Sequence, residues 1–140
     1  MKRETGQTDG GPTKSLVLVA EDSQTTAELT QKMLEFFGYQ VIVARNGVEA
    51  VAKAAAETPD LIVMDIHMPV MDGLQATVEI RKDPKTKSIP ILAATAKAMA
   101  GDEERCLASG CDSYISKPFT HTQLAAAVKK LLSEPLADRK

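Results

Sequence analysis

The strongest constraint on the fold is an alternation between short apolar runs and longer segments of helical period, which occurs five times after residue 14. The apolar runs are rich in β-branched residues, as strands are, and three of them are apolar nearly throughout. That composition is typical of parallel strands that helices cover on both faces. The predicted strands are residues 15–20, 40–44, 60–64, 89–94 and 112–116.

Each predicted strand is followed by a segment with helix signals. Asp22 and Ser23 are suited to cap the first helix, and Gly38 is suited to end it. The second helix is expected to stop before Pro59, because the residue preceding a proline disfavours helical angles. The predicted helices are residues 24–37, 48–57, 74–82, 101–109 and 121–133. Helical spacing predicts that the first helix faces inward with Thr26, Leu29, Thr30, Met33 and Phe37.

Strict alternation of five strands and five helices with short connections predicts an α/β domain with a doubly wound, five-stranded parallel sheet. The domain is expected to occupy residues 15–133 of the 140. Residues 1–14 are polar and contain a Gly-Gly pair, which indicates a disordered tail or linker, and residues 134–140 are expected to form a C-terminal tail. We expect no DNA-binding or enzymatic output domain in the few residues after the last helix.

Composition excludes several classes of function. The chain has 17 basic and 19 acidic residues, a formal charge of -2, so it lacks the excess positive charge that favours nucleic acid or anionic membranes. No apolar run approaches the ~20 residues of a membrane span, and the N-terminus lacks the apolar segment of a secretory signal, so a cytoplasmic location is expected. Cys106 and Cys111 lack metal-type spacing and are expected to be reduced packing residues.

Charged and polar side chains collect where the predicted strands end. Glu21 and Asp22 follow the first strand, Asp65 the third, Thr95 the fourth and Lys117 the fifth. Taken singly, each also fits a helix cap or a surface charge. Because parallel strands place their carboxyl ends at one edge of the sheet, the five residues are expected to converge there. Three adjacent carboxylates need a counter-charge, and Mg²⁺ with oxygen ligands fits best; Asp65, which ends an apolar strand, is the candidate nucleophile.

Four ordered motifs resemble those of the receiver domain of two-component response regulators. The resemblance covers about residues 15–132 and implies a flavodoxin-like sheet with strand order 2-1-3-4-5. It also implies a domain that catalyses its own phosphorylation and dephosphorylation. The motifs are residues 19–22 (VAED), 64–73 (MDIHMPVMDG), 93–97 (AATAK) and 114–119 (YISKPF).

The resemblance implies a metal-dependent phosphoacceptor site. Asp65 corresponds to the aspartate that takes a phosphoryl group from a phosphohistidine. Asp22, Asp65 and the backbone carbonyl of His67 correspond to direct Mg²⁺ ligands, with Mn²⁺ as an alternative ion. Glu21 corresponds to the acidic residue that reaches the ion through water, although the family often has Asp at this position.

The resemblance further implies the residues that respond to the phosphoryl group. Lys117, the Thr95 hydroxyl and the Ala96 amide correspond to groups that contact phosphoryl oxygens. Thr95 and Tyr114 correspond to the switch pair, in which the aromatic ring moves inward when the threonine moves. The Lys117-Pro118 peptide bond is cis in the family.

The implied partners are a histidine kinase or histidine phosphotransfer domain, and a downstream protein at the face formed by the fourth helix, fifth strand and fifth helix. A phosphorylation-linked dimer is a further expectation. One alternative is a pseudo-receiver that binds partners without phosphorylation. Another is a flavodoxin, which Glu21 and Asp22 disfavour because they would meet the flavin phosphate. A third is an aspartate-nucleophile phosphatase, which is disfavoured because residues 65–67 lack a second aspartate as general acid. The chain also resembles receivers of hybrid histidine kinases, so a stand-alone regulator and a fragment of a longer kinase both remain open.

Overall fold

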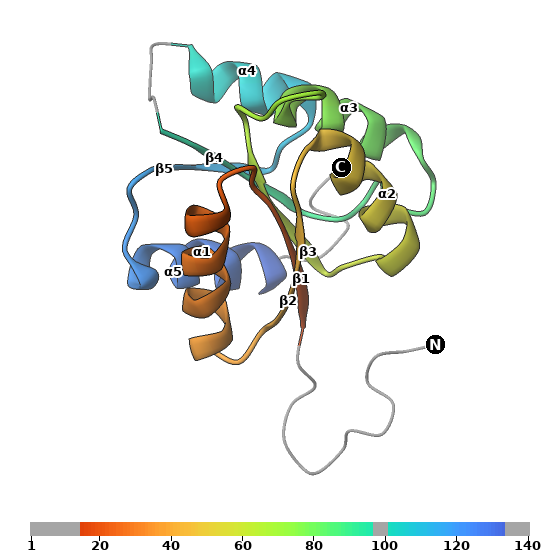
Figure 1. Cartoon of the computed structure of the whole chain (residues 1–140). Coiled ribbons are helices and arrows are strands. Elements are labelled where there is room, and N and C mark those ends of the chain that lie inside the picture. The colour runs from red at the N-terminus through yellow and green to blue at the C-terminus, as the bar shows by residue number, and fades with distance from the viewer. Residues whose placement is uncertain (1–14, 97–100, 134–140) are drawn as a thin grey trace.

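The computed structural model describes residues 15–96 and 101–133 (Figure 1). The two predicted tails and Lys97, which ends the third motif, lie outside the described residues. Strands and helices alternate along the chain as expected. They are β1 (Leu16–Ala20), α1 (Gln24–Phe36), β2 (Gln40–Ala44), α2 (Gly47–Glu57), β3 (Leu61–Asp65), α3 (Gly73–Lys82), β4 (Ile91–Thr95), α4 (Asp102–Ser109), β5 (Ser113–Ser116) and α5 (His121–Ser133).

The five strands form one parallel sheet in the order β2-β1-β3-β4-β5, which confirms the predicted fold and strand order. β1 lies between β2 and β3, so that Val17 pairs with Val41 on one side and with Leu61 on the other. The chain runs from β1 outward to β2 on one side and then to β3, β4 and β5 on the other, so the strand order reverses at β1. In such sheets, ligands bind at the carboxyl ends of the strands next to this reversal.

Successive strand residues point to opposite faces of the sheet, and each face has its own core. Val17 and Val19 face a layer made by α1 and α5, whereas Leu18 and Ala20 face α2, α3 and α4 (Figure 1). All four side chains are buried. Covering helices on both faces explain why the central strands are apolar nearly throughout.

Two strands extend one residue further than predicted. Asp65 is the last residue of β3 and pairs with Ala94, and Thr95 is the last residue of β4 and pairs with Ser116. Both had been expected to follow their strands. The polar side chains do not interrupt the ladder because backbone pairing with a neighbouring strand continues through them. The chemistry-bearing side chains are therefore held by the sheet itself.

The inward face predicted for α1 is partly wrong. The buried residues of this helix are Ala27, Thr30 and Leu34, whereas Leu29 is 54% exposed and Phe37 is 42% exposed. The small Ala27 allows the helix to approach the sheet closely. The predicted apolar stripe exists, but it is rotated away from the sheet and toward the β5–α5 loop.

Two expectations from composition have structural counterparts. Cys106 and Cys111 are free thiols and both are buried in the core on the α4 side of the sheet, as packing residues are. Within the described ranges, the helices are too short or too polar to cross a bilayer.

Candidate functional site

The predicted acidic cluster forms at the carboxyl edge of the sheet. Glu21 directly follows β1, and Asp65 ends the neighbouring β3. One carboxylate oxygen from each of Glu21, Asp22 and Asp65 lies within 4.8 Å of the other two. Glu21 and Asp65 are only 5% and 6% exposed, whereas Asp22 is exposed. The cluster is thus a partly buried pocket of oxygen donors that opens to solvent at Asp22.

Lys117, which directly follows β5 at the same edge of the sheet, brings the opposite charge to this cluster. Its Nζ atom lies 2.6 Å from Oε1 of Glu21 and 3.6 Å from Oδ1 of Asp65. The backbone N–H of Lys117 donates to the carbonyl of Thr95 at 2.8 Å, which fixes the start of the β5–α5 loop against β4. The Lys117-Pro118 peptide bond is cis. Of the two carboxylates, Glu21 is the nearer partner of the ammonium group.

Burial dominates the electrostatics of Asp65. It raises the pKa of this carboxyl from its usual 3.8 to about 7, and the adjacent Glu21 raises it as well. The Lys117 ammonium and the His67 N–H, which donates to Oδ1 at 3.2 Å, act in the opposite direction. The ionised form of this carboxyl is disfavoured, and further positive charge nearby would stabilise it. A divalent cation among the three carboxylates would supply it.

Thr95 and Tyr114 lie on the two strands beyond β3. Thr95 is fully buried at the end of β4, whose neighbour on one side is the strand that ends in Asp65. Tyr114 on β5 pairs with Ala93 and is half-buried against the core on the α4 side. Ala96 is exposed directly after β4. The structure therefore places the predicted switch residues on adjacent strands that lead from the acidic cluster to the far edge of the sheet.

A model of the response regulator receiver domain matches residues 17–129, which include all of these residues. The chain belongs to this family. Two relatives are the polar-differentiation response regulators DivK of Brucella anthropi and Brucella ovis. The first is 40% identical over 118 residues, 84% of this chain and 96% of that protein. The second is 40% identical over 122 residues, 87% and 98% of the two chains.

Solved structures of receiver domains have the same fold. The receiver domain of a sensor histidine kinase from Pseudomonas aeruginosa, with a magnesium ion in its active-site cleft, has a TM-score of 0.82 and 35% identity over 86% of this chain and 99% of that one. The chemotaxis protein CheY4 of Vibrio cholerae has a TM-score of 0.80 and 30% identity, with coverage of 84% and 98%. The acidic cluster of this receiver domain is consistent with Mg²⁺ binding.

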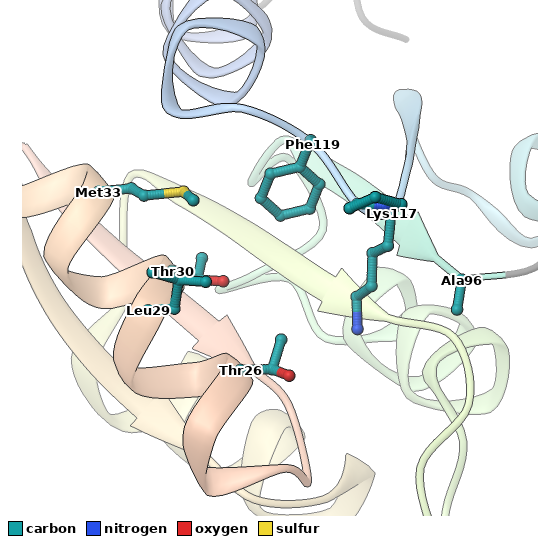
Figure 2. Close-up of a pocket in the computed structure, with 8 residues that line it drawn as sticks. Thr26, Leu29, Thr30, Met33, Ala96, Lys117 and Phe119 are labelled. Carbon is teal, nitrogen blue, oxygen red and sulfur yellow. The ribbon is translucent and has the colours of Figure 1, made fainter.

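The receiver domain also carries a groove of about 330 Å³ between α1 and the β5–α5 loop. Figure 2 shows Met33, Leu29 and Thr26 along one side, with Phe119 and Lys117 opposite. The Lys117 side chain extends from the groove toward the end of a central strand (Figure 2). Sequence reasoning had assigned the α1 stripe to the core and had not singled out Phe119.

The two histidines of the chain take different positions. The backbone N–H of His67 contacts Asp65, while the residue as a whole is exposed. His121, at the start of α5, stacks on Phe37 with ring centroids 5.9 Å apart and 29° between the rings. His121 is therefore an aromatic contact between α1 and α5 and is not among the residues of the acidic cluster.

Proposed function

We propose that this receiver domain is a phosphoacceptor switch of a two-component phosphorelay, with Asp65 as the acceptor. The observation that carries the proposal is the buried Asp65 carboxyl, which lies between two carboxylates and the Lys117 ammonium at the ligand-binding edge of the sheet. An Asp65 oxygen attacks the phosphorus of a phosphohistidine, and the P–N bond breaks as the acyl phosphate forms. The leaving imidazole nitrogen keeps the electron pair and takes a proton from solvent.

Asp22, Asp65 and the backbone carbonyl of His67 are proposed to hold Mg²⁺, with Glu21 reaching it through water. The donors are all oxygens, which suits a hard divalent cation, and Mn²⁺ accepts the same ligands. The bound ion would neutralise negative charge at the phosphoryl oxygens. The carboxylate cluster supports this assignment because one oxygen of each carboxylate lies within 4.8 Å of the other two.

Lys117 is proposed to exchange partners on phosphorylation. Its ammonium is 2.6 Å from Glu21 in the structure, and a phosphoryl group on Asp65 offers a second anionic oxygen within reach of the same side chain. The Thr95 hydroxyl and the Ala96 N–H are proposed to bind the remaining phosphoryl oxygens. Their position at the end of β4, beside β3, supports this role.

A histidine kinase or a phosphotransfer domain is the proposed donor, in the cytoplasm. The groove supports an approach across α1, because its apolar side chains lead directly to Lys117 and Ala96 at the edge of the site. The donor step is the same for a stand-alone response regulator and for a receiver that belongs to a sensor histidine kinase. Both arrangements of the whole protein stay open under this proposal.

Intact-mass measurement after incubation with acetyl phosphate and Mg²⁺ tests the proposal. A single phosphoryl adduct is expected, and it should disappear when EDTA removes the metal. A pseudo-receiver that only binds partners would remain at its unmodified mass under all conditions. That result would refute the proposed phosphoacceptor function.

The two acidic residues after β1 are expected to contribute unequally to metal binding. Asp22→Ala should weaken Mg²⁺ binding by about tenfold or more, because a direct ligand is lost. Glu21→Ala should have a smaller effect, since Glu21 is already engaged by Lys117 at 2.6 Å and by the Ser23 N–H at 3.2 Å. Calorimetric titration with Mg²⁺ measures both, and equal affinities for the two variants would contradict the assignment.

Phosphorylation is expected to change the surroundings of Tyr114 while those of Tyr39, the only other tyrosine, stay the same. Charge added at Asp65 draws in Thr95, which gives the half-buried Tyr114 ring room to move inward on β5. Tyr39 packs against the core on the opposite face of the sheet and serves as the internal control. Ring NMR signals recorded with and without beryllofluoride measure both, and an unmoved Tyr114 would rule out this switch.

The proposed output surface follows from that motion. α4, β5 and α5 would change together, and a downstream protein or a second copy would bind the altered face. Association that depends on beryllofluoride, measured by light scattering, distinguishes the phosphorylation-linked dimer from binding of a different protein.

A further inference from the structure

Gly47 has backbone angles that any residue can adopt, so its conformation does not explain why this position is a glycine. It begins α2, and its φ lies outside the left-handed region that Gly38, Gly101 and Gly110 occupy. At ordinary helical angles, glycine destabilises a helix by roughly 0.5–1 kcal/mol relative to alanine. A buried glycine that begins a helix at ordinary angles therefore needs an explanation from its surroundings.

The explanation is a close backbone contact with the β3–α3 loop. The N–H of Gly47 donates to the carbonyl of Met71 at 2.9 Å. A Cβ atom at Gly47 would collide with that carbonyl oxygen and would lie 2.8 Å from the Met71 Cβ. Only a residue without a side chain lets the first turn of α2 approach this loop. Asn46 fixes that turn, because its side chain accepts a hydrogen bond from the Glu49 N–H at 2.9 Å.

The loop held by Gly47 is itself strained. Met71 donates its N–H to the carbonyl of Pro69 at 2.7 Å, which closes a three-residue turn around Val70 at a φ of 70°. A β-branched residue at positive φ costs on the order of 1–2 kcal/mol, and the Val70 side chain recovers little of this because it is 80% exposed. Such a turn persists only where the surrounding structure holds it.

The same loop is anchored at its other end by α3. The N–H of Gly73 donates to the carbonyl of Ile66 at 2.9 Å, and a Cβ at Gly73 would collide with the carbonyl oxygen of Asp65. His67 lies between the Ile66 and Met71 anchors, next to Met68, whose side chain is buried in the core. The backbone of His67 thus belongs to a segment fixed from both sides.

We propose that Gly47 is a positioning residue for the metal site: through Met71 it holds the loop that presents the backbone carbonyl of His67. This inference rests on the proposed function, in which that carbonyl is a Mg²⁺ ligand. Gly47 itself belongs to α2, outside the acidic cluster and the groove, so its effect must travel through the loop backbone.

The test is an Mg²⁺ titration of Gly47→Ala, with Gly38→Ala as the matched control. Gly38 has a φ of 95° with no atom within 4 Å of an added Cβ, so its replacement strains the backbone between α1 and β2 without touching the site. We expect about tenfold weaker Mg²⁺ binding for Gly47→Ala, as for other residues that orient metal ligands, and unchanged affinity for Gly38→Ala. In the metal-free protein, the amide NMR signals of His67 and Met71 should shift only in Gly47→Ala.

Wild-type Mg²⁺ affinity or unshifted amides in a folded Gly47→Ala would overturn the inference. If that variant does not fold, Asn46→Ala decides, because it loosens the first turn of α2 without adding an atom at Gly47. A threefold or larger loss of Mg²⁺ affinity in Asn46→Ala supports the inference, and no loss overturns it. Failure of the wild-type protein to bind Mg²⁺ would instead refute the metal site, and so separates the two proposals.

Discussion

Asp65→Asn is expected to abolish the phosphoryl adduct and, in the same variant, to make the metal-free protein more stable at neutral pH. An amide is nearly isosteric with a carboxyl but is a poor nucleophile, so the acceptor is lost while the packing is kept. The stabilisation has a separate cause. Burial and Glu21 disfavour a negative charge at this position, and the amide carries none.

The pH dependence of this stabilisation follows from the raised pKa. The pKa of Asp65 is about 7 in the folded protein against an ordinary 3.8, so between these values the folded state binds more protons than the unfolded state. The free energy of unfolding of the metal-free wild type therefore falls as pH rises through this window and levels off above about pH 8. The difference in free energy of unfolding between Asp65→Asn and wild type should therefore be about 3 kcal/mol larger at pH 8 than at pH 5, in favour of the variant.

Urea denaturation in EDTA at both pH values measures the difference, and intact mass after acetyl phosphate and Mg²⁺ measures the adduct. Asp83→Asn is the control, because this half-buried carboxylate at the end of α3 accepts a hydrogen bond from the Lys85 N–H at 2.9 Å, which an asparagine side chain also accepts. It should leave both readouts unchanged. An adduct of undiminished yield in Asp65→Asn would remove Asp65 from the acceptor role, and a stability difference independent of pH would contradict the raised pKa.

The sequence was sufficient to predict the elements whose signals are local. Asp65 was predicted at the sheet edge because it ends an apolar run, and Lys117 was predicted there because it follows a strand. In the structure, Nζ of Lys117 lies 3.6 Å from Oδ1 of Asp65. The rotation of α1 was not predictable in this way. A stripe of apolar residues shows that a helix has an apolar face, but not whether the sheet or a neighbouring loop covers it, and Leu29 and Met33 line the groove.

Contacts between residues far apart in the chain could not be predicted from the sequence either. The sequence predicted the second helix from residue 48, and only the position of Met71, 24 residues after Gly47, explains the glycine that begins α2. Arg81 reads as one of two exposed cations in the last turn of α3, where the helix dipole favours them. Its partners belong to two loops that follow α3, so no spacing rule brings them together.

Arg81 joins these loops through all of its nitrogen atoms. Nε donates to the carbonyl of Gly110 at 2.9 Å, and one terminal nitrogen donates to the carbonyls of Lys87 and Ile89 at 2.9 and 2.6 Å. The other terminal nitrogen lies 2.8 Å from Oδ2 of Asp112, an atom that also accepts from the Ile91 N–H at 2.8 Å. A single guanidinium therefore fixes the end of α4 and the entries to β4 and β5.

Arg81→Met is expected to lower the free energy of unfolding by about 3 kcal/mol, because a partly buried carboxylate and several loop carbonyls lose their donor. Lys82→Met is the matched control on the same helix turn. Lys82 pairs with Glu79 at 3.3 Å, but these side chains are 66% and 45% exposed, and its loss should change stability by less than about 1 kcal/mol. Urea denaturation of both variants measures the difference.

Both should still form the Asp65 adduct when folded, since Arg81 binds the α3–β4 and α4–β5 loops at the opposite edge of the sheet from the acidic cluster. Equal stabilities for the two variants would show that the guanidinium bonds do not hold these loops.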